Sequence, residues 1–313
     1  MYNTYATNSN EYRRIFWDAA KGKKVDSQLL IGLSSNDHGA LAAPDDFGKK
    51  CTEVIEKNGV MHRLCSVVDA FEHGSRIFAK DCADYADWIP EGAEIPIYEG
   101  IDDFTTYSVD MHKIAAFVKF STSFVYDAAF DLEGHLADSL GRNIAHAEDK
   151  GFITGTGTDT PYGILDEKNG AETGVSAESL TFDNVISLFF SVKPEYRRNG
   201  TWLMNDETAL ALRLLKDSDG NYLWNQASDT ILGRPVEISE YMPAAESGSS
   251  PILFGDFRYY WIMRRTPIHV RTLQEKFAVL NQIGYLATEF LDGRLIRRDA
   301  VKALTIAASE KDV

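Results

Sequence analysis

The sequence contains little cysteine and no long hydrophobic run. Its 313 residues include three cysteines, Cys51, Cys65 and Cys82. An odd number of cysteines without close pairing does not form a disulfide framework, so we expect three reduced thiols. No segment reaches the about 18 apolar residues of a membrane-spanning helix. The first residues also lack the apolar core of a secretory signal. These absences favour a protein made in the cytoplasm, with no membrane partner.

Positive charge is scarce as well. Lys and Arg number 32 against 47 Asp and Glu, which gives a formal net charge of −15. A nucleic-acid-binding protein needs a basic surface for the phosphates, and this composition argues against one. The same charge suits a container wall that must not adhere to packed DNA.

The common catalytic motifs are missing. The seven histidines form neither H-E-x-x-H nor a zinc spacing with cysteine. The glycine-rich stretch GTGTDTPYG (155–163) lacks the lysine of a phosphate loop and follows a helix instead of preceding one, so we interpret it as a turn. DSDGN (217–221) resembles a calcium loop, but Ser228 stands where the bidentate glutamate belongs. We therefore expect no catalytic residue, no metal and no cofactor.

One periodic segment dominates the chain. From Ser121 to Lys150 apolar residues recur every three or four positions, which predicts a single amphipathic helix. Thr122 or Ser123 is suited to cap its start, and Gly151 to end it. Glycine is costly inside a helix, so two internal glycines indicate close packing against another element: Gly134 and Gly141.

Shorter elements are expected on both sides of this helix. Turn signals and hydrophobic periods predict both helices and strands. The expected helices lie within 11–24, over 47–59, from Thr181 to Val192 and after an Asn205 cap. The expected strands lie over 60–71, 114–120, 201–204 and 231–243, followed by paired strands that turn at Asp292-Gly293.

The segment 74–109 has another character. It mixes proline, glycine, acidic residues and aromatics without a helical period. About 30 residues without a core of their own are unusual inside a compact domain. The segment is therefore either functional or a long two-stranded finger, and a finger would display apolar side chains that a partner covers. These side chains are Tyr85, Trp88, Ile89, Ile95 and Ile97.

The N-terminal residues allow two interpretations. A short amphipathic helix would place Tyr12, Ile15, Phe16 and Ala19 on one side, and a polar loop follows it. This segment is either an arm that packs on another molecule or an ordinary helix of the same domain. The sequence leaves both open.

Taken in order, several blocks resemble the major capsid proteins of tailed double-stranded-DNA bacteriophages, the HK97-fold family. The resemblance covers nearly the whole chain. It begins with EYRRIFWDAAKGK and HGALAAPDDFGKKCTEVIEKNGVMHRLCSVV, and continues with the long helix that ends in KGFITGTGTDTPYGIL. The most specific blocks are TWLMNDETALALRLLKDSDGNYLW, ILGRPVEISEYMP and ILFGDFRYYWIMRR.

The resemblance implies an α+β, HK97-like capsid fold with four named parts. They are an N-terminal arm (1–45), a peripheral domain (46–71, 110–178 with the spine helix, and the strands of 252–313), an extended loop (72–109) and an axial domain (179–251). It also implies contacts between subunits. The candidate residues are Tyr12, Phe16, Trp17, Tyr85, Trp88 and Ile89.

The implied function is structural. Such a subunit self-assembles into hexamers and pentamers of an icosahedral head that encloses double-stranded DNA without sequence-specific binding. A scaffolding protein, a portal and an optional decoration protein would be its partners. It would be assembled in the bacterial host cytoplasm and reside in the virion. Two alternatives remain: an encapsulin-type cellular nanocompartment shell with the same fold, and an enzyme such as a metal hydrolase.

Two family features have no clear counterpart. Many members carry a long, cleaved scaffolding segment, whereas about 45 residues precede the body here; scaffolding is then a separate protein or this chain lacks the segment. Some members form lysine–asparagine cross-links between subunits. Lys80 could donate, but no acceptor can be placed, so we predict no cross-link.

Overall fold

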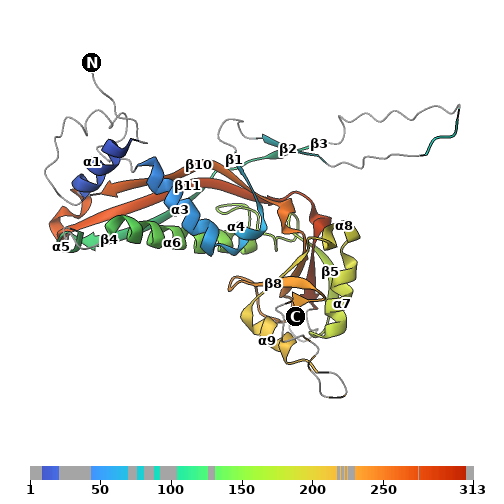
Figure 1. The fold of residues 1–313 in the computed structure, drawn as a ribbon. Helices are drawn as coiled ribbons and strands as arrows, with labels where there is room; N and C mark the ends of the chain where they lie inside the picture. Colours follow the sequence, from blue (N-terminus) through green and yellow to red (C-terminus); the bar gives the residue numbers. More distant parts are fainter. Residues whose placement is uncertain are drawn as a thin grey trace.

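The computed structural model describes most of the chain. The described residues are 9–20, 44–69, 76–80, 88–91, 104–125, 131–216, 230–273 and 275–307, with Asp219, Tyr222 and Trp224. Figure 1 shows a long, flat first unit, a two-stranded hairpin that projects from it, and a second unit set at an angle below one end.

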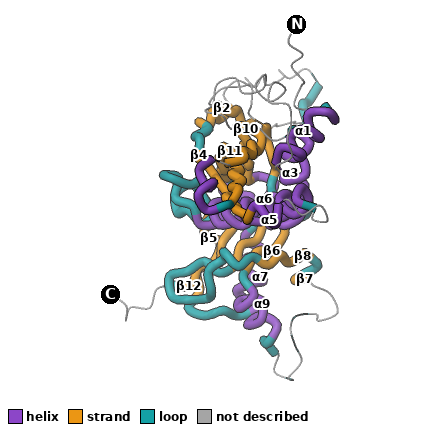
Figure 2. Tube along the Cα trace, turned by 90° about the vertical axis from the view of Figure 1, so that its left-hand side faces the viewer, coloured by secondary structure: helices purple, strands orange, loops and turns teal. Residues whose placement is uncertain are grey.

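The first unit is built on a four-stranded sheet. Its strand order is β1 (Ser66–Asp69), β10 (Tyr260–Leu273), β11 (Gln282–Leu295) and β4 (His112–Ser121). β10, β11 and β4 pair antiparallel, and β1 runs parallel to β10. Three helices pack over this sheet: α1 (Asn10–Ala20), α3 (Asp45–Asn58) and the long α6 (Leu132–Thr154). Figure 2 shows the helices beside the two longest strands.

The core of the first unit explains why α6 forms. Its apolar residues recur at steps of four, and each is fully buried: Leu132, Leu136, Leu140 and Ile144. They pack with α3 and with the inner face of the sheet. At Gly141 a Cβ would lie 2.8 Å from the Val54 Cβ and 3.0 Å from the Cys51 carbonyl oxygen of α3. The absent side chain therefore lets α3 and α6 approach, which confirms the close packing predicted there.

The limits of α6 differ from the prediction. The helix begins at Leu132, where the Asp131 side chain accepts a hydrogen bond from the Gly134 amide. Thr122–Val125 forms a separate short helix, α5. The helix also continues past Gly151, which has ordinary space around it, and ends at Thr154. The predicted single helix from Ser121 was therefore wrong at both ends.

A second correction concerns residues 60–71, predicted as one strand. Val60–Leu64 forms the helix α4, and β1 begins at Ser66. The Asp149 carboxylate on α6 accepts hydrogen bonds from the amides of Val60 (2.9 Å) and Met61 (2.8 Å). This carboxylate satisfies two free amides at the start of α4. Asp149, which is distant in the sequence, thus stabilises a helix where the local hydrophobic pattern predicts a strand.

The second unit is built on a six-stranded sheet. Its order is β5 (Glu172–Ala177), β12 (Val301–Ile306), β9 (Ile252–Gly255), β6 (Thr201–Met204), β8 (Arg234–Ile238) and β7 (Thr230–Ile231). The helices α7 (Phe182–Ser191) and α9 (Asp206–Arg213) contribute to its core around Trp202 and Phe254, with the short α8 (Pro194–Arg197) beside them. Short 3₁₀ turns lie at Phe257–Tyr259 (η1), Glu275–Leu280 (η2) and Arg298–Ala300 (η3).

Local signals predicted this unit well. The Thr181 side chain accepts from the Asn184 amide at the start of α7. The Asn205 side chain accepts from the Thr208 amide at the start of α9. The predicted helix start at Thr181, the Asn205 cap and the strand over 201–204 are confirmed. The single strand predicted over 231–243 was wrong, because the chain turns at Leu232 and Gly233 to form the hairpin of β7 and β8, and β8 ends at Ile238.

The sheet also crosses the predicted domain limits. β5 and β9 fall within the ranges 110–178 and 252–313, and the last strand, β12, was the one that we also considered for the axial domain. The ladders join all three strands to β6, because β12 pairs with β5 and β9, and β9 pairs with β6. A third core cluster connects the two units, and its members come from both: Met61, Phe152, Ile153, Ile164, Leu203, Leu253, Tyr260, Ile262, Leu291, Val301 and Ala303 among others.

The predicted hairpin turn at Asp292-Gly293 was wrong. Both residues lie within β11, opposite Met263 and Ile262 of β10. The chain reverses instead through η2, and Asn281 there has φ 53°. The Asp292 carboxylate is buried and accepts from the amides of Asp110 (2.9 Å) and Gly293 (2.8 Å). Buried acceptors satisfied by backbone amides are stable inside a sheet.

Candidate assembly surfaces

The structure contains the base of the predicted finger, a two-stranded hairpin. β2 (Arg76–Lys80) and β3 (Phe104–Ser108) pair antiparallel, with Arg76 opposite Ser108. The Tyr107 hydroxyl donates to the Ile296 carbonyl oxygen (3.2 Å), and the Arg294 guanidinium lies 5.6 Å from the Tyr107 ring. These contacts fix the root of the hairpin to the end of β11. Figure 1 shows the hairpin projecting away from both units.

The far end of the finger presents apolar surface. The Trp88 side chain is 103% exposed and Ile89 is 38% exposed, and Pro90 and Glu91 beside them are also exposed. A tryptophan without intramolecular cover is costly in water unless a partner buries it. Tyr85, Ile95 and Ile97 lie outside the described residues.

The N-terminal candidates lie in a different environment. Tyr12, Phe16 and Trp17 of α1 are buried within this chain. The Trp17 ring packs edge-on against Phe47 of α3 at 5.2 Å, and Arg13 donates to the Glu133 carboxylate of α6 at 2.6 Å. The described helix therefore packs on its own subunit. Contact of these residues with a neighbouring subunit stays a prediction. Among the described candidates, only Trp88 and Ile89 are exposed, and we propose subunit contact for these two alone.

The glycine-rich corner after α6 is a turn, as predicted. Thr156 and Tyr162 form an isolated bridge, and Gly157 has φ +78°. The amides of Gly163, Ile164 and Leu165 donate to the carbonyl oxygens of Gly155, Phe152 and Ile153. These amides are thus already bonded to backbone, and none of them is available to cradle a phosphate.

A buried polar cluster lies where α4 and α6 meet the sheet. His62 Nε2 lies 2.8 Å from the Glu148 Oε2 atom, and both side chains are nearly inaccessible. Burial alone would lower the pKa of His62, but the hydrogen bond and charge of Glu148, with Asp149, raise it above its usual value. Burial, with the charge of Glu148, raises the pKa of Glu289 to about 8. The His62–Glu148 pair and the Asp149 hydrogen bonds tie α4 to α6, with the Glu289 carboxyl group of β11 buried near them.

None of these groups forms a metal site. Within the part of the chain that the structure describes, no three His, Cys, Asp or Glu side chains converge on a position for an ion. The same part contains no helix long and apolar enough to span a bilayer. Cys51 and Cys65 are free thiols, and Cys82 lies outside the described residues. Most of the DSDGN segment lies outside them too.

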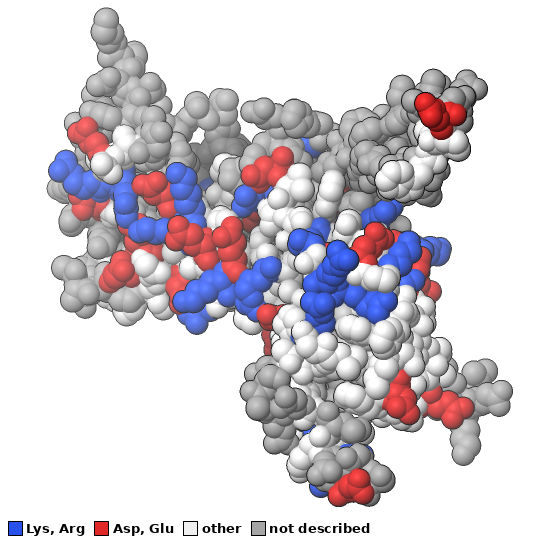
Figure 3. Space-filling model, turned by 45° about the vertical axis from the view of Figure 1, so that its right-hand side comes forward, with Lys and Arg blue, Asp and Glu red and all other residues white. Residues whose placement is uncertain are grey.

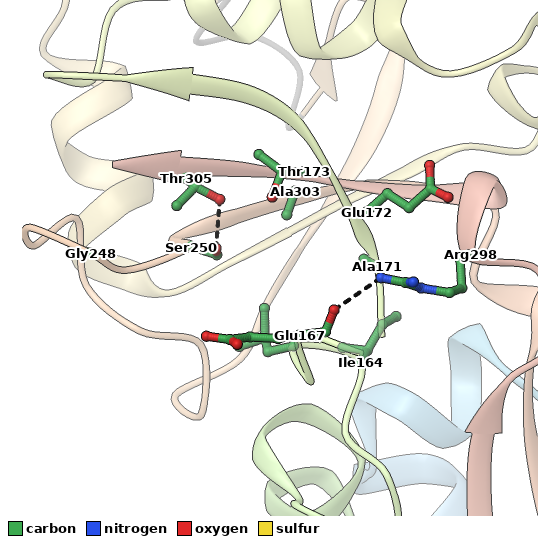
Figure 4. Close-up of a pocket in the computed structure, with 11 residues that line it drawn as sticks. Ile164, Glu167, Ala171, Glu172, Thr173, Gly248, Ser250, Arg298, Ala303 and Thr305 are labelled. Carbon is green, nitrogen blue, oxygen red and sulfur yellow. Dashed lines mark hydrogen bonds between the residues drawn. The ribbon is translucent and has the colours of Figure 1, made fainter. Parts of the chain in front are cut away.

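A hollow of about 540 Å³ lies beside the six-stranded sheet, between its β5–β12 end and the loop after α6. Figure 4 shows Arg298 bonded to Glu167 and Ser250 bonded to Thr305 in its lining. Arg298 donates to the carbonyl oxygens of Gly170 (2.9 Å) and Glu167 (3.0 Å), and the Ser250 and Thr305 hydroxyls share a 2.9 Å bond. These groups act as structural ties, and the hollow has the character of a surface depression.

Basic side chains gather on one side of this acidic protein. Figure 3 shows Lys and Arg clustered below the projecting hairpin. The residues around α8 and η3 supply such a cluster, and the Lys193 ammonium lies 2.7 Å from the Asp299 carboxylate. Its members are Lys193, Arg197, Arg198, Arg297, Arg298 and Lys302, which outnumber the acidic residues beside them, Glu172, Glu195 and Asp299. A local basic surface on a chain of charge −15 favours an acidic partner surface.

The family model for the phage capsid family matches residues 39–306 of this chain. The chain belongs to the phage capsid family. The match includes the finger, the spine helix α6 and both sheets, so the whole described body except α1 lies within it. The α+β, HK97-like fold expected from the sequence is confirmed.

Solved structures support the same assignment. The capsid of an empty GTA particle has a TM-score of 0.69 and 29% identity, covering 80% of this chain and 90% of that one. The capsid of the native GTA particle has a TM-score of 0.65 and 28% identity, covering 79% and 90%. A chain from Gordonia phage Cozz shares the fold at 14% identity and a TM-score of 0.57, covering 80% and 87%.

One curated relative is similar to about half of this chain. It is the capsid polyprotein of Pseudomonas phage PAJU2, 26% identical over 172 residues. The match covers 52% of this chain and 25% of that relative's length. Proteins of this family are structural subunits, so the enzyme hypothesis falls, and the matches do not favour the nanocompartment alternative.

Proposed function

We propose that this chain is the major capsid subunit of a phage or phage-like particle, which forms hexamers and pentamers of an icosahedral head around double-stranded DNA. The family match over residues 39–306 carries this proposal. The exposed Trp88 on the finger supports it, because a capsid neighbour would cover that side chain. The net charge of −15 fits a wall that repels packed DNA.

The proposed surroundings follow from this role. A scaffolding protein would guide assembly in the bacterial host cytoplasm, a portal would occupy one vertex, and a decoration protein is an optional outer partner. The virion would be the final location. The proposed division of labour places the first unit and the finger between neighbours and the second unit nearest the capsomer centre.

Electron microscopy with light scattering tests the proposal. We expect rings of five or six chains, or closed shells, from the purified protein or from its co-expression with a scaffolding protein. A compact monomer under every one of these conditions contradicts it.

Replacing Trp88 with alanine should impair assembly and leave the isolated subunit as stable as the parent. A buried interface tryptophan contributes about 2 kcal/mol or more, so the protein concentration needed for assembly should rise at least about tenfold. The Trp88→Phe variant is the matched control, since it keeps an aromatic ring and should assemble nearly as the parent does. Equal thermal destabilisation of unassembled Trp88→Ala subunits would show that the side chain serves folding instead.

A further inference from the structure

The second unit has two different outer flanks. The sheet order places β5 and β12 at one end and β8 and β7 at the other. α7 packs on β5 and β12, whereas α9 lies next to β8. Figure 1 shows α7 and α8 along one side of the unit and α9 on the other. We call them the α7 flank (Asp183, Phe190, Lys193, Arg197, Arg198) and the α9 flank (Asp206, Glu207, Leu210, Leu214, Ile238).

The α7 flank presents one protruding aromatic ring. Phe190 is 64% exposed, although Phe189 beside it is partly buried in the core. The ring is held in place by its neighbours: the Arg197 guanidinium lies 5.0 Å from its centroid, and the Phe189 ring packs against it edge-on at 5.3 Å. A fixed ring in water loses little conformational entropy when a partner covers it.

The α9 flank offers an apolar hollow of about 410 Å³. Leu210 and Ala209 of α9 and Ile238 of β8 line it, with Asp206 and Glu207 at one end and Arg213 at the other. Leu210 is 58% exposed, and Leu214, one turn further on, is exposed as well. A cavity of about 150 Å³ accepts a benzene ring, so this hollow has room for a phenylalanine side chain.

The charges of the two flanks also match. α7 begins with the exposed Asp183, and after Phe190 come Lys193, Arg197 and Arg198. Glu195 and the Asp299 carboxylate, 2.7 Å from Lys193, lie beside these three basic groups, which leaves one positive charge in excess. α9 begins with Asp206 and Glu207 and ends with Arg213. If the two helices pack antiparallel, acidic and basic groups meet at both ends and the helix dipoles are opposed favourably. Parallel packing would bring like charges together.

We propose that the α7 flank of one subunit binds the α9 flank of a second copy of this chain, with Phe190 inserted beside Leu210 and Ile238. The two surfaces differ and lie on opposite sides of the unit. Such a contact is head-to-tail, and its repetition closes a ring when the rotation permits. This inference rests on the proposed capsid function and assigns the residues that hold neighbouring second units together within one capsomer.

Cysteine cross-linking during assembly tests the contact. The Phe190→Cys/Leu210→Cys double variant is assembled, oxidised with diamide and run on a denaturing gel without reductant. A disulfide requires Cβ atoms about 3.5–4.5 Å apart. We expect a ladder from dimers up to closed pentamers or hexamers. A mixture of the two single variants should give dimers only, and each single variant alone should stay monomeric, because the contact is head-to-tail.

Two controls keep the result specific. The parent chain, with its native cysteines, should run as a monomer under the same oxidation. The Val279→Cys/Leu210→Cys variant should also do so, because Val279 is fully exposed on η2, at the far end of the first unit. Shells visible by microscopy without the ladder overturn the proposed contact and leave the capsid function intact. A parent that never assembles overturns both.

Charge reversal covers the case in which the double cysteine variant fails to fold. Lys193→Glu/Arg198→Glu and Asp206→Lys/Glu207→Lys should each slow assembly at low salt at least about tenfold, since like charges would then meet. Combining all four substitutions restores opposite charges and should bring assembly back toward the parent rate. Failure of the combination to recover, while its subunits unfold like the parent, contradicts the proposed pairing.

Discussion

Replacing Gly293 with alanine should destabilise the subunit by about 2–3 kcal/mol, near the upper end for overpacking a buried site. The new Cβ would lie 2.4 Å from the Tyr260 hydroxyl and 2.8 Å from the Phe152 ring. Neither neighbour can retreat easily, because both are fully buried and the Tyr260 hydroxyl donates to the Tyr162 carbonyl oxygen at 2.7 Å. Urea unfolding followed by tryptophan fluorescence measures the loss.

Gly151→Ala is the matched control for this substitution. It lies one residue before Phe152 in the last turns of α6, and its new Cβ would meet the nearest atom, Pro161 Cδ, at an ordinary 3.7 Å. Alanine favours a helix over glycine by about 1 kcal/mol, so this variant should be as stable as the parent or more so. Similar unfolding midpoints for the two variants would show that β11 is not pressed against the end of α6.

Replacing Glu289 with glutamine should stabilise the subunit at pH 8 by about 1–3 kcal/mol. Glu289 is 3% exposed, and its Oε2 atom has no hydrogen-bond partner among the residues that the structure describes. Burial first, and then the charge of Glu148, raise its pKa to about 8. Because the pKa of Glu289 is higher in the folded state than in the unfolded state, protonation of this carboxyl group favours folding. That contribution is complete below about pH 4.5 and is lost as the pH rises through about 8. The free energy of unfolding of the parent should thus fall between about pH 4.5 and 8, whereas that of the glutamine variant should show no such fall from this site.

Urea titrations at pH 5 and pH 8 check this sign. The gain from Glu289→Gln should be small at pH 5 and grow toward pH 8. Glu91→Gln, which removes an exposed carboxylate on the finger, should leave the unfolding free energy unchanged at both values. A constant difference between the Glu289 variant and the parent would mean that the carboxyl group is ionised throughout or neutral throughout this range.

Local signals predicted several elements of this fold. Thr181 and Asn205 cap their helices because a side-chain oxygen reaches an amide three residues ahead, a contact that needs no distant partner. The finger was predictable from its composition, since no periodic core pattern runs through 74–109. The exposure of Trp88 followed from the same absence.

Contacts between distant residues account for what the sequence could not reveal. Asp149 converts 60–64 from an expected strand into a helix, from about 90 positions away along the chain. Asp292-Gly293 has the local chemistry of a turn, yet the Asp110 amide and the Phe152 ring hold it inside a strand. Phe190 and Leu210 showed no distinct sequence signal, because an exposed apolar residue on a helix differs from a core residue only once the core is known.

The shared core cluster between the two units has a mechanical consequence. Phe152 at the end of α6, Tyr260 and Ile262 of β10, and Leu203 and Val301 of the second sheet pack in one cluster. Bending one unit against the other would open a cavity there, at a cost of several kcal/mol. The body of the subunit should therefore behave as a single stiff plate. The curvature of a shell built from such rigid subunits would then be set, and changed, by rotation of neighbouring subunits at the interfaces between them.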